Sequence, residues 1–153
     1  MDPDGTKIEL WQPNRETERS EQAMIEGSCH CGRVTWKFGV TPKTATTCNC
    51  TVCRRYGVFW AYDLAGDRTE ISGPTRAYVR EGGRIGFYFC THCGCITHYR
   101  ALLPDSEGKS RTAVNLRMAD PAVVATLLVH KFEGLDTFTS LGQDGRCVAD
   151  LWF

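Results

Sequence analysis

The sequence has no apolar run long enough to cross a membrane and no excess of charge of either sign. Its longest candidate run, AVVATLLV at 122–129, is far shorter than the roughly 20 residues that a membrane helix requires. Lys plus Arg and Asp plus Glu both number 18, so the formal net charge is zero. These absences argue against a membrane-spanning protein and a polyanion-binding surface. We therefore expect neither a membrane nor a nucleic acid as a partner.

The first 23 residues lack the layout of an export signal. They are polar and carry acidic residues early, where an export signal has a basic segment followed by an apolar one. We therefore expect residues 1–23 to form a flexible N-terminal leader and the protein to be cytoplasmic. The remaining residues, 24–153, are numerous enough to bury a core without disulfides, and we expect them to form a single domain.

Strand patterns dominate the rest of the chain. In the segment 28–40, Val34, Trp36 and Phe38 alternate with polar residues, which indicates a half-buried strand. Further strand-like segments are rich in aromatic and β-branched residues, and glycine-containing turns separate several of them. These segments lie at 58–64, 75–80, 84–90, 96–103 and 111–118.

One segment near the C-terminus favours a helix. Residues 120–132 are mostly apolar, with Asp120 placed to cap the helix and Pro121 in its first turn. The glycines at 142–145 favour an irregular tail. The sequence thus predicts a mainly β protein with one short C-terminal helix.

Cysteine is the over-represented residue, with nine in the chain. The odd number and the absence of an export pattern favour metal binding over a disulfide framework. Zinc takes four ligands, so eight clustered cysteines suffice for two sites. The eight fall into three tight groups: Cys29 and Cys31; Cys48, Cys50 and Cys53; Cys90, Cys93 and Cys95.

Three segments together carry a family resemblance. GSCHCGRVTWKF at 27–38, CNCTVCRRYG at 48–57 and FCTHCGC at 89–95 are similar to the glutathione-dependent formaldehyde-activating enzyme family, which also contains centromere protein V. The order of the three cysteine spacings is more specific than any one of them. The resemblance extends from about residue 25 to about residue 135.

The resemblance implies a fold and two zinc ions per chain. The fold would be a β-tent, in which antiparallel sheets are joined at zinc knuckles. A structural zinc would be held by Cys29, Cys31, Cys90 and Cys93. The second zinc, proposed as catalytic, would be held by Cys48, Cys50 and Cys53.

The implied activity is that of a carbon–sulfur lyase that joins formaldehyde to glutathione. A catalytic zinc keeps three protein ligands and one exchangeable position, and the middle group offers three cysteines. An incoming thiol such as glutathione would lose its proton on this metal. Arg54 and Arg55 follow directly and are candidates to bind a carboxylate of the thiol carrier.

Several points stay open in the sequence. Cys95 can fill the fourth position of the second zinc, which would close that site. His92 and His98 are alternatives as ligands or proton carriers. His130 falls late in the expected helix, where a histidine ordinarily stabilises the helix C-terminus and has no functional role. The substrate is not defined, and neither is the choice between a monomer and a homodimer.

Three functions are compatible with these residues. The first is a zinc enzyme acting on a glutathione or other thiol adduct, which predicts a cleft beside the middle cysteines lined by Phe59, Trp60 and Tyr62. The alternative is a non-catalytic zinc-stabilised binding or scaffold domain, which predicts two sealed sites and an exposed apolar patch. A sulfoxide reductase ranks third, because Cys147 is the only cysteine outside the three groups.

Overall fold

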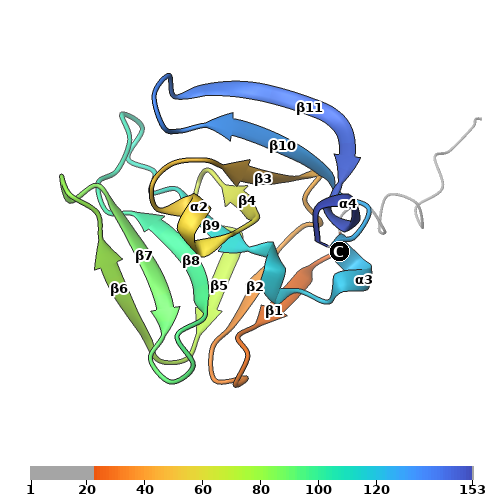
Figure 1. The fold of residues 1–153 in the computed structure, drawn as a ribbon. Helices are drawn as coiled ribbons and strands as arrows, with labels where there is room; N and C mark the ends of the chain where they lie inside the picture. Colours follow the sequence, from red (N-terminus) through yellow and green to blue (C-terminus); the bar gives the residue numbers. More distant parts are fainter. Residues whose placement is uncertain (1–22, 153) are drawn as a thin grey trace, which may run out of the picture.

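The computed structural model describes residues 23–152, so all but the last residue of the expected leader at 1–23 lies outside the described residues. The strands of the described part form two sheets, a small one of three strands and a large one of eight (Figure 1). The sequence prediction of a mainly β protein is confirmed.

The small sheet is antiparallel, with the strand order β1-β2-β5. Its strands are β1 (Ile25–Ser28), β2 (Thr35–Phe38) and β5 (Thr69–Ser72). Trp36 and Phe38 of β2 are buried while Thr35 and Lys37 are exposed, as the alternation predicted.

The large sheet has the order β11-β10-β3-β4-β9-β8-β7-β6. All its neighbouring strands are antiparallel except β10 and β3, which are parallel. Its strands are β3 (Thr44–Cys48), β4 (Trp60–Asp63), β6 (Thr75–Val79), β7 (Ile85–Cys90), β8 (Ile96–Ala101), β9 (Thr112–Asn115), β10 (Leu128–Glu133) and β11 (Thr139–Cys147).

The predicted helix over 120–132 is wrong in its extent. The helix α3 covers only Pro121–Val124, and Asp120 caps it by accepting a hydrogen bond from the Ala122 amide at 2.9 Å. The second half of the segment forms β10 because it pairs with β3 on one side and β11 on the other. The tail expected to be irregular is strand β11, in which Gly142 and Gly145 have positive φ angles and the pairing with β10 shifts in register.

Three other short helical segments complete the described part of the chain. They are α2 (Cys53–Tyr56), the 3-10 helix η1 (Leu116–Met118) and α4 (Val148–Trp152). Among residues 23–152, no helix combines the length and the apolar character that crossing a membrane would need.

The large sheet buries residues on both faces. Phe59 and Val114 belong to the same core cluster as Trp36 of the small sheet, whereas their chain neighbours Trp60 and Ala113 belong to a second cluster on the opposite face. This alternation gives the large sheet a second apolar face beside α2.

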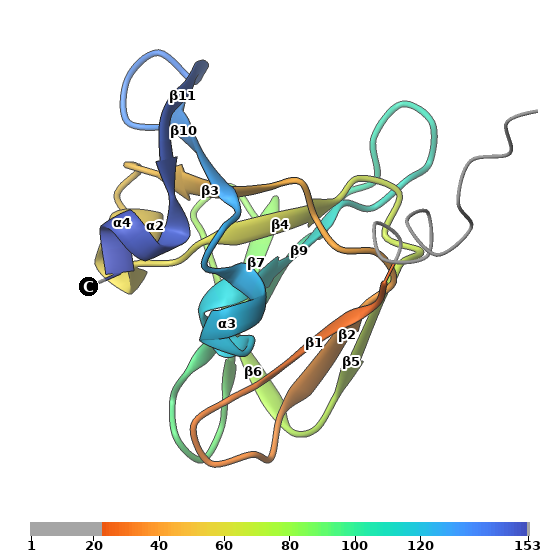
Figure 2. The same ribbon diagram turned by 90° about the vertical axis from the view of Figure 1, so that its right-hand side faces the viewer.

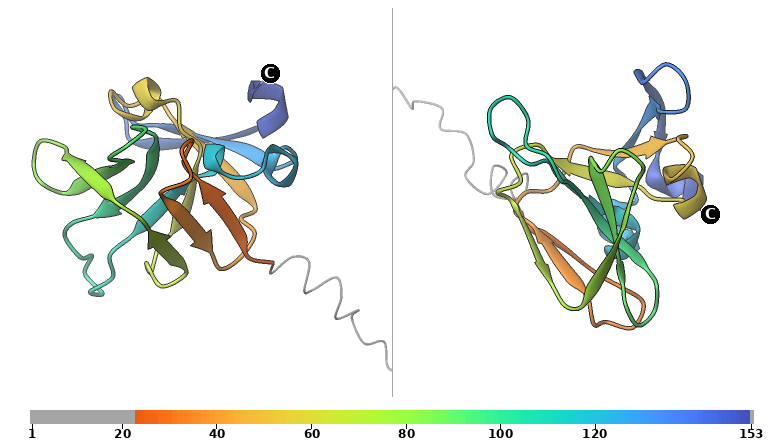
Figure 3. Two further views of the ribbon diagram at one scale, coloured as in Figure 1. Left: turned by 90° about the horizontal axis from the view of Figure 1, so that it is seen from below. Right: turned by 90° about the vertical axis from the view of Figure 1, so that its left-hand side faces the viewer.

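The two sheets approach each other at one end, where the β1–β2 turn lies beside the β7–β8 turn (Figure 2; Figure 3, right). The β10–β11 hairpin stands away from the small sheet, at the opposite end of the molecule (Figure 2). The cysteine groups lie in these turns and at the end of β3.

Candidate functional site

Four cysteines converge where the two sheets meet. Cys29 and Cys31 come from the β1–β2 turn, Cys90 ends β7, and Cys93 lies in the β7–β8 turn; we call these four the knuckle cluster. Their sulfurs all lie within 4.8 Å of one another, with Cys31 Sγ 3.6 Å from the sulfurs of both Cys29 and Cys90. The group predicted for a structural zinc is thus brought together.

Tight turns aim these sulfurs at one point. Gly94 takes a φ of 74°, which favours glycine, and donates its amide to the Cys90 carbonyl at 2.9 Å. Backbone amides also donate to the sulfurs, from Val34 to Cys29 at 3.3 Å and from His92 to Cys90 at 3.4 Å. Such donors stabilise thiolates, the form in which cysteine binds a metal.

The middle cysteines form a second group, which we call the trio. Cys48 ends β3, Cys50 lies in the following turn, and Cys53 begins α2; their sulfurs also lie within 4.8 Å of one another. The Cys50 amide donates to the Cys48 sulfur at 3.4 Å, and the Cys53 amide donates to the Cys50 sulfur at 3.3 Å. The indole N–H of Trp60 donates to the Cys53 sulfur at 3.3 Å.

A neighbouring loop packs directly on the trio. A Cβ atom on Gly134 would lie 2.6 Å from the Cys48 sulfur and 3.1 Å from Cys50 Cβ, so this position requires glycine. Asn49 accepts a hydrogen bond from the Gly134 amide at 2.8 Å and donates to Glu133 at 2.9 Å. The trio is therefore tied to the start of the β10–β11 connection.

The potential metal ligands of both cysteine groups fit a zinc ion. All are sulfurs, which zinc accepts readily, and each group has amide or indole N–H donors placed on its sulfurs. Amides of Cys95 and Cys31 lower the pKa of Cys93 to about 6, which favours its thiolate. Both groups could therefore hold a metal ion.

Cys95 is not brought to the trio. It packs against the core beside the knuckle cluster, and its thiol lies 3.7 Å from the Ile96 carbonyl oxygen. Burial raises the pKa of Cys95, and negative charge on Cys93 and Cys29 would raise it further. The structure therefore leaves the trio with three cysteines, because the turn at Gly94 sends Cys95 back toward the core.

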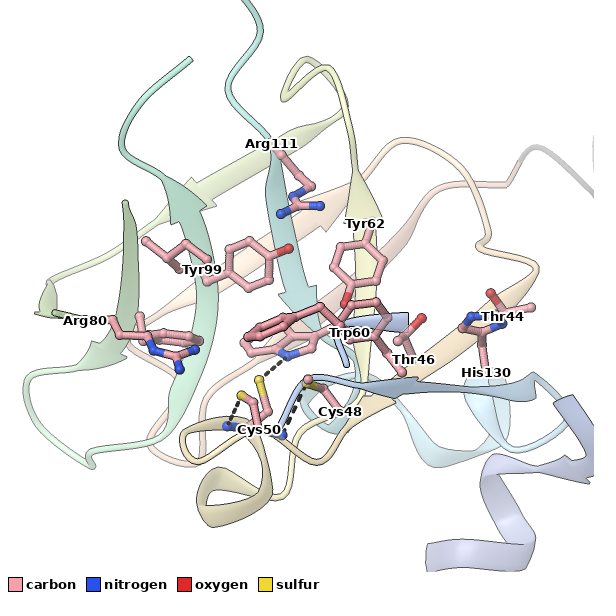
Figure 4. A pocket seen from close by; sticks show the side chains of 16 residues that line it. Thr44, Thr46, Cys48, Cys50, Trp60, Tyr62, Arg80, Tyr99, Arg111 and His130 are labelled. Carbon is pink, nitrogen blue, oxygen red and sulfur yellow. Dashed lines mark hydrogen bonds between the residues drawn. The ribbon is translucent and has the colours of Figure 1, made fainter. Parts of the chain in front are cut away.

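The trio forms the base of a cavity of about 510 Å³ (Figure 4). This volume lies within the roughly 300–1,000 Å³ of small-molecule sites. Trp60 and Tyr62 line it, as predicted for an enzyme, but Phe59 faces the core on the other side of the sheet. The remaining lining residues are Thr44, Thr46, Arg80, Ile85, Phe87, Tyr99, Arg111, His130, Phe132, Gly134 and Phe138.

The arginines of the cavity are not those that the sequence suggested. Arg54 and Arg55 lie on the exposed side of α2, and Arg55 donates to the Thr51 carbonyl at 2.7 Å. The cavity is lined instead by Arg80, which follows β6, and Arg111, which precedes β9. No local motif marks these two arginines, since only the order of the strands places them beside the cysteines.

The histidines divide between core, surface and cavity. His98 is buried, stacks on Tyr88 and has a pKa lowered to about 3 by burial and the charge of Arg100. His92 is exposed at the knuckle. His130, expected in a helix, lies on β10, lines the cavity and shares a 2.8 Å hydrogen bond with Ser140.

Two tyrosines, Tyr62 and Tyr99, line the same cavity as the trio. Burial raises the pKa of both Tyr62 and Tyr99 above the usual value for tyrosine. Both therefore keep their protons at neutral pH and can act as hydrogen-bond donors. The rings of Tyr99 and Trp60 contact edge to face, with centroids 5.0 Å apart.

Comparisons with known proteins agree with this geometry. The model of the family described as glutathione-dependent formaldehyde-activating enzyme matches residues 24–127, which include both cysteine clusters. The chain belongs to this family. The family resemblance read from the cysteine spacing is thus confirmed, whereas the cavity residues of β10 and beyond lie outside the matched segment.

The fold also resembles a solved structure. The crystal structure of a Rhodobacter sphaeroides protein is similar with a TM-score of 0.51 at 23% sequence identity, over 61% of this chain and 86% of that one. At this identity the likeness concerns the fold alone. No curated protein matches the chain.

Proposed function

We propose that this protein is a zinc-dependent enzyme of the carbon–sulfur lyase type, which joins glutathione or another small thiol to formaldehyde or a related aldehyde. The position of the trio carries the proposal. Its three sulfurs face a cavity of about 510 Å³, in a chain of the glutathione-dependent formaldehyde-activating enzyme family. A site that serves only folding has no need of such a cavity.

Two zinc ions per chain belong to this proposal. The knuckle cluster would supply a complete set of four thiolates, and its ion would join the two sheets as in a β-tent. The trio would supply three ligands, as is usual for a catalytic zinc. When bound there, zinc would lower the pKa of an incoming thiol and polarise an aldehyde oxygen.

The residues around the trio would orient the reactants. Addition of a thiol to an aldehyde forms a carbon–sulfur bond, breaks the carbonyl π bond and moves the thiol proton to the oxygen. Tyr62 and Tyr99, which keep their own protons, can donate a hydrogen bond to that oxygen. Trp60 holds the Cys53 sulfur in place through its indole N–H.

The test combines zinc analysis with exchange NMR of formaldehyde, glutathione and their adduct. Zinc-replete protein is expected to carry two zinc ions and to exceed the uncatalysed rate of adduct formation. Cys50→Ser should carry one zinc ion and lose the acceleration. Cys147→Ser should keep both properties, because Cys147 belongs to neither cysteine cluster. Two zinc ions without acceleration for any small thiol would instead favour the scaffold function.

A further inference from the structure

The cavity above the trio has largely aromatic walls. Four of its rings pack together on the face formed by β4, β7 and β8, each with its centre between 5.0 and 6.4 Å from that of another. Three of them lie above the cysteines in Figure 4. Phe132 and Phe138 are two further rings of the lining. Such walls favour a ligand with an apolar or aromatic part. The four packed rings are Trp60, Tyr62, Phe87 and Tyr99.

Phe132 and Phe138 come from a part of the chain that the family match does not include. The family model matches residues 24–127, and both rings follow that segment. Phe132 lies on β10, where it pairs in parallel register with Cys48 of the trio. Phe138 lies at the end of the connection from β10 to β11. This side of the cavity is therefore a place where the chain can adapt the family site to a substrate of its own.

Phe138 is held in an unfavourable state. Its φ of 53° is positive, which no other non-glycine residue shows in the described part of the chain, and a bulky side chain is strained there. Its ring is 63% exposed, so most of its apolar surface lies in water. Hydrogen bonds from the amides of 135–137 to Glu133 fix the loop that leads to it. Strained residues persist at ligand sites, and this ring has an open face for a ligand.

The aldehyde of the proposed reaction is the reactant that can cover this ring. Formaldehyde carries only hydrogens on its carbonyl carbon, so it has nothing to place against Phe132 and Phe138. An aldehyde with an aromatic ring has a flat apolar group for them. Removal of that group from water and ring-to-ring contacts would both favour its binding.

We infer that Phe132 and Phe138 adapt this site to an aldehyde that carries an aromatic ring. The inference rests on the proposed function, since it takes the addition of a thiol to an aldehyde as given. The bonds are those of that addition: a carbon–sulfur bond forms, the carbonyl π bond breaks, and the thiol proton moves to the oxygen. The aromatic ring takes no part in these steps and contributes binding alone.

The first test compares three aldehydes on zinc-replete protein, with glutathione as the thiol throughout. The probes are formaldehyde, benzaldehyde and cyclohexanecarboxaldehyde, which is close to benzaldehyde in size but has no aromatic ring. Exchange NMR gives each catalysed rate, which is divided by the uncatalysed rate of the same aldehyde. Benzaldehyde is expected to show a ratio roughly 10-fold above those of the other two.

The outcomes separate this inference from the proposed function. Acceleration of formaldehyde or of cyclohexanecarboxaldehyde that equals or exceeds that of benzaldehyde would overturn the inference and keep the proposed function. No acceleration with any of the three aldehydes would overturn both.

The second test measures binding without turnover. The probe is 4-fluorobenzyl alcohol, which has the aromatic ring but no carbonyl group, and fluorine NMR gives its dissociation constant on zinc-replete protein. Phe138→Ala is expected to weaken binding roughly 10-fold. Phe138→Gly should weaken it as much, yet melt at a higher temperature than Phe138→Ala, because glycine adopts a φ of 53° without strain. Loss of binding in this variant is thus not loss of folding.

Leu141→Ala is the matched control for Phe138→Ala. Leu141 is 60% exposed on β11, close to Phe138 in the chain, but it does not line the cavity. This variant should bind 4-fluorobenzyl alcohol as the wild-type protein does. Equal affinity of the wild-type protein and both Phe138 variants would overturn the inference.

Discussion

Trp60 shows how one side chain can tune the trio. Its indole N–H lies 3.3 Å from the Cys53 sulfur at the buried base of the cavity. Burial raises the pKa of Cys53, and this hydrogen bond opposes the rise, so the indole favours the thiolate. Trp60→Phe keeps a ring but removes the donor. We expect zinc affinity at the trio to fall about 10-fold, measured by competition with a chromophoric chelator.

Trp36→Phe is the matched control. Trp36 is as fully buried as Trp60, but its indole nitrogen has no hydrogen-bond partner among the described residues, and it packs in the other core cluster. The substitution should lower stability through lost packing and leave zinc affinity at the trio unchanged. An equal loss of affinity in the two variants would contradict the role given to the Trp60 donor.

Among the elements, regular alternation made some strands predictable. β2 alternates strictly between buried and exposed residues, so its sequence pattern is sufficient. Residues 128–133 are different, because their apolar residues fit a helix or a strand until β3 pairs with them. β3 itself, with the sequence TATTC, has no alternation that could reveal it.

The same contrast holds for the candidate site. The cysteine groups could be found because the ligands from one turn must be close in sequence, as in the trio. Arg80, Arg111 and His130 could not, because they reach the cavity from parts of the large sheet that are far apart in sequence: the end of β6, the start of β9 and β10. Whether Cys95 joins the trio could not be decided from the sequence, because spacing alone does not say which way the chain turns after Gly94.

The connection between β10 and β11 depends on one carboxylate. Glu133 accepts hydrogen bonds from the amides of Leu135, Asp136 and Thr137 and from the Thr137 hydroxyl. The connection leads to Phe138, which lines the cavity with a positive φ of 53°. Hydrogen bonds from Thr137, and then from Asn49, lower the pKa of Glu133 from 4.5 to about 2.

The lowered pKa fixes the sign of a pH effect. A carboxyl group with a lowered pKa stabilises the loop fully above about pH 4.5, and this stabilisation is lost as the pH falls toward 2. We expect the side-chain carboxyl carbon of Glu133 to titrate near pH 2 in an NMR experiment. Glu133→Gln should speed up amide exchange at residues 135–137 at neutral pH. A titration midpoint near 4.5 would contradict the hydrogen-bonded loop.

For the whole molecule, the knuckle cluster and the trio hold different parts together. The knuckle cluster joins a turn of the small sheet to a turn of the large sheet, and both Cys29 and Cys90 are buried in the core between the sheets. The sulfurs of the trio all come from one short segment, from the end of β3 to the start of α2, on the other face of the large sheet. Loss of the first should therefore separate the sheets, and loss of the second should remain local.

This difference predicts unequal losses of stability in two serine variants. A structural zinc contributes several kcal/mol to folding, and in a protein of this size each kcal/mol shifts the melting temperature by roughly 2–4 °C. Cys93→Ser is expected to lower the melting temperature by about 10 °C or more. Cys50→Ser should lower the melting temperature by only about 2–4 °C. It should also abolish the acceleration of thiol–aldehyde adduct formation. Cys147→Ser should change neither, because its thiol belongs to neither cluster. Calorimetric melting of the three variants tests whether the knuckle cluster supports the fold more than the trio does. Equal destabilisation by Cys93→Ser and Cys50→Ser would mean that both clusters support the fold alike.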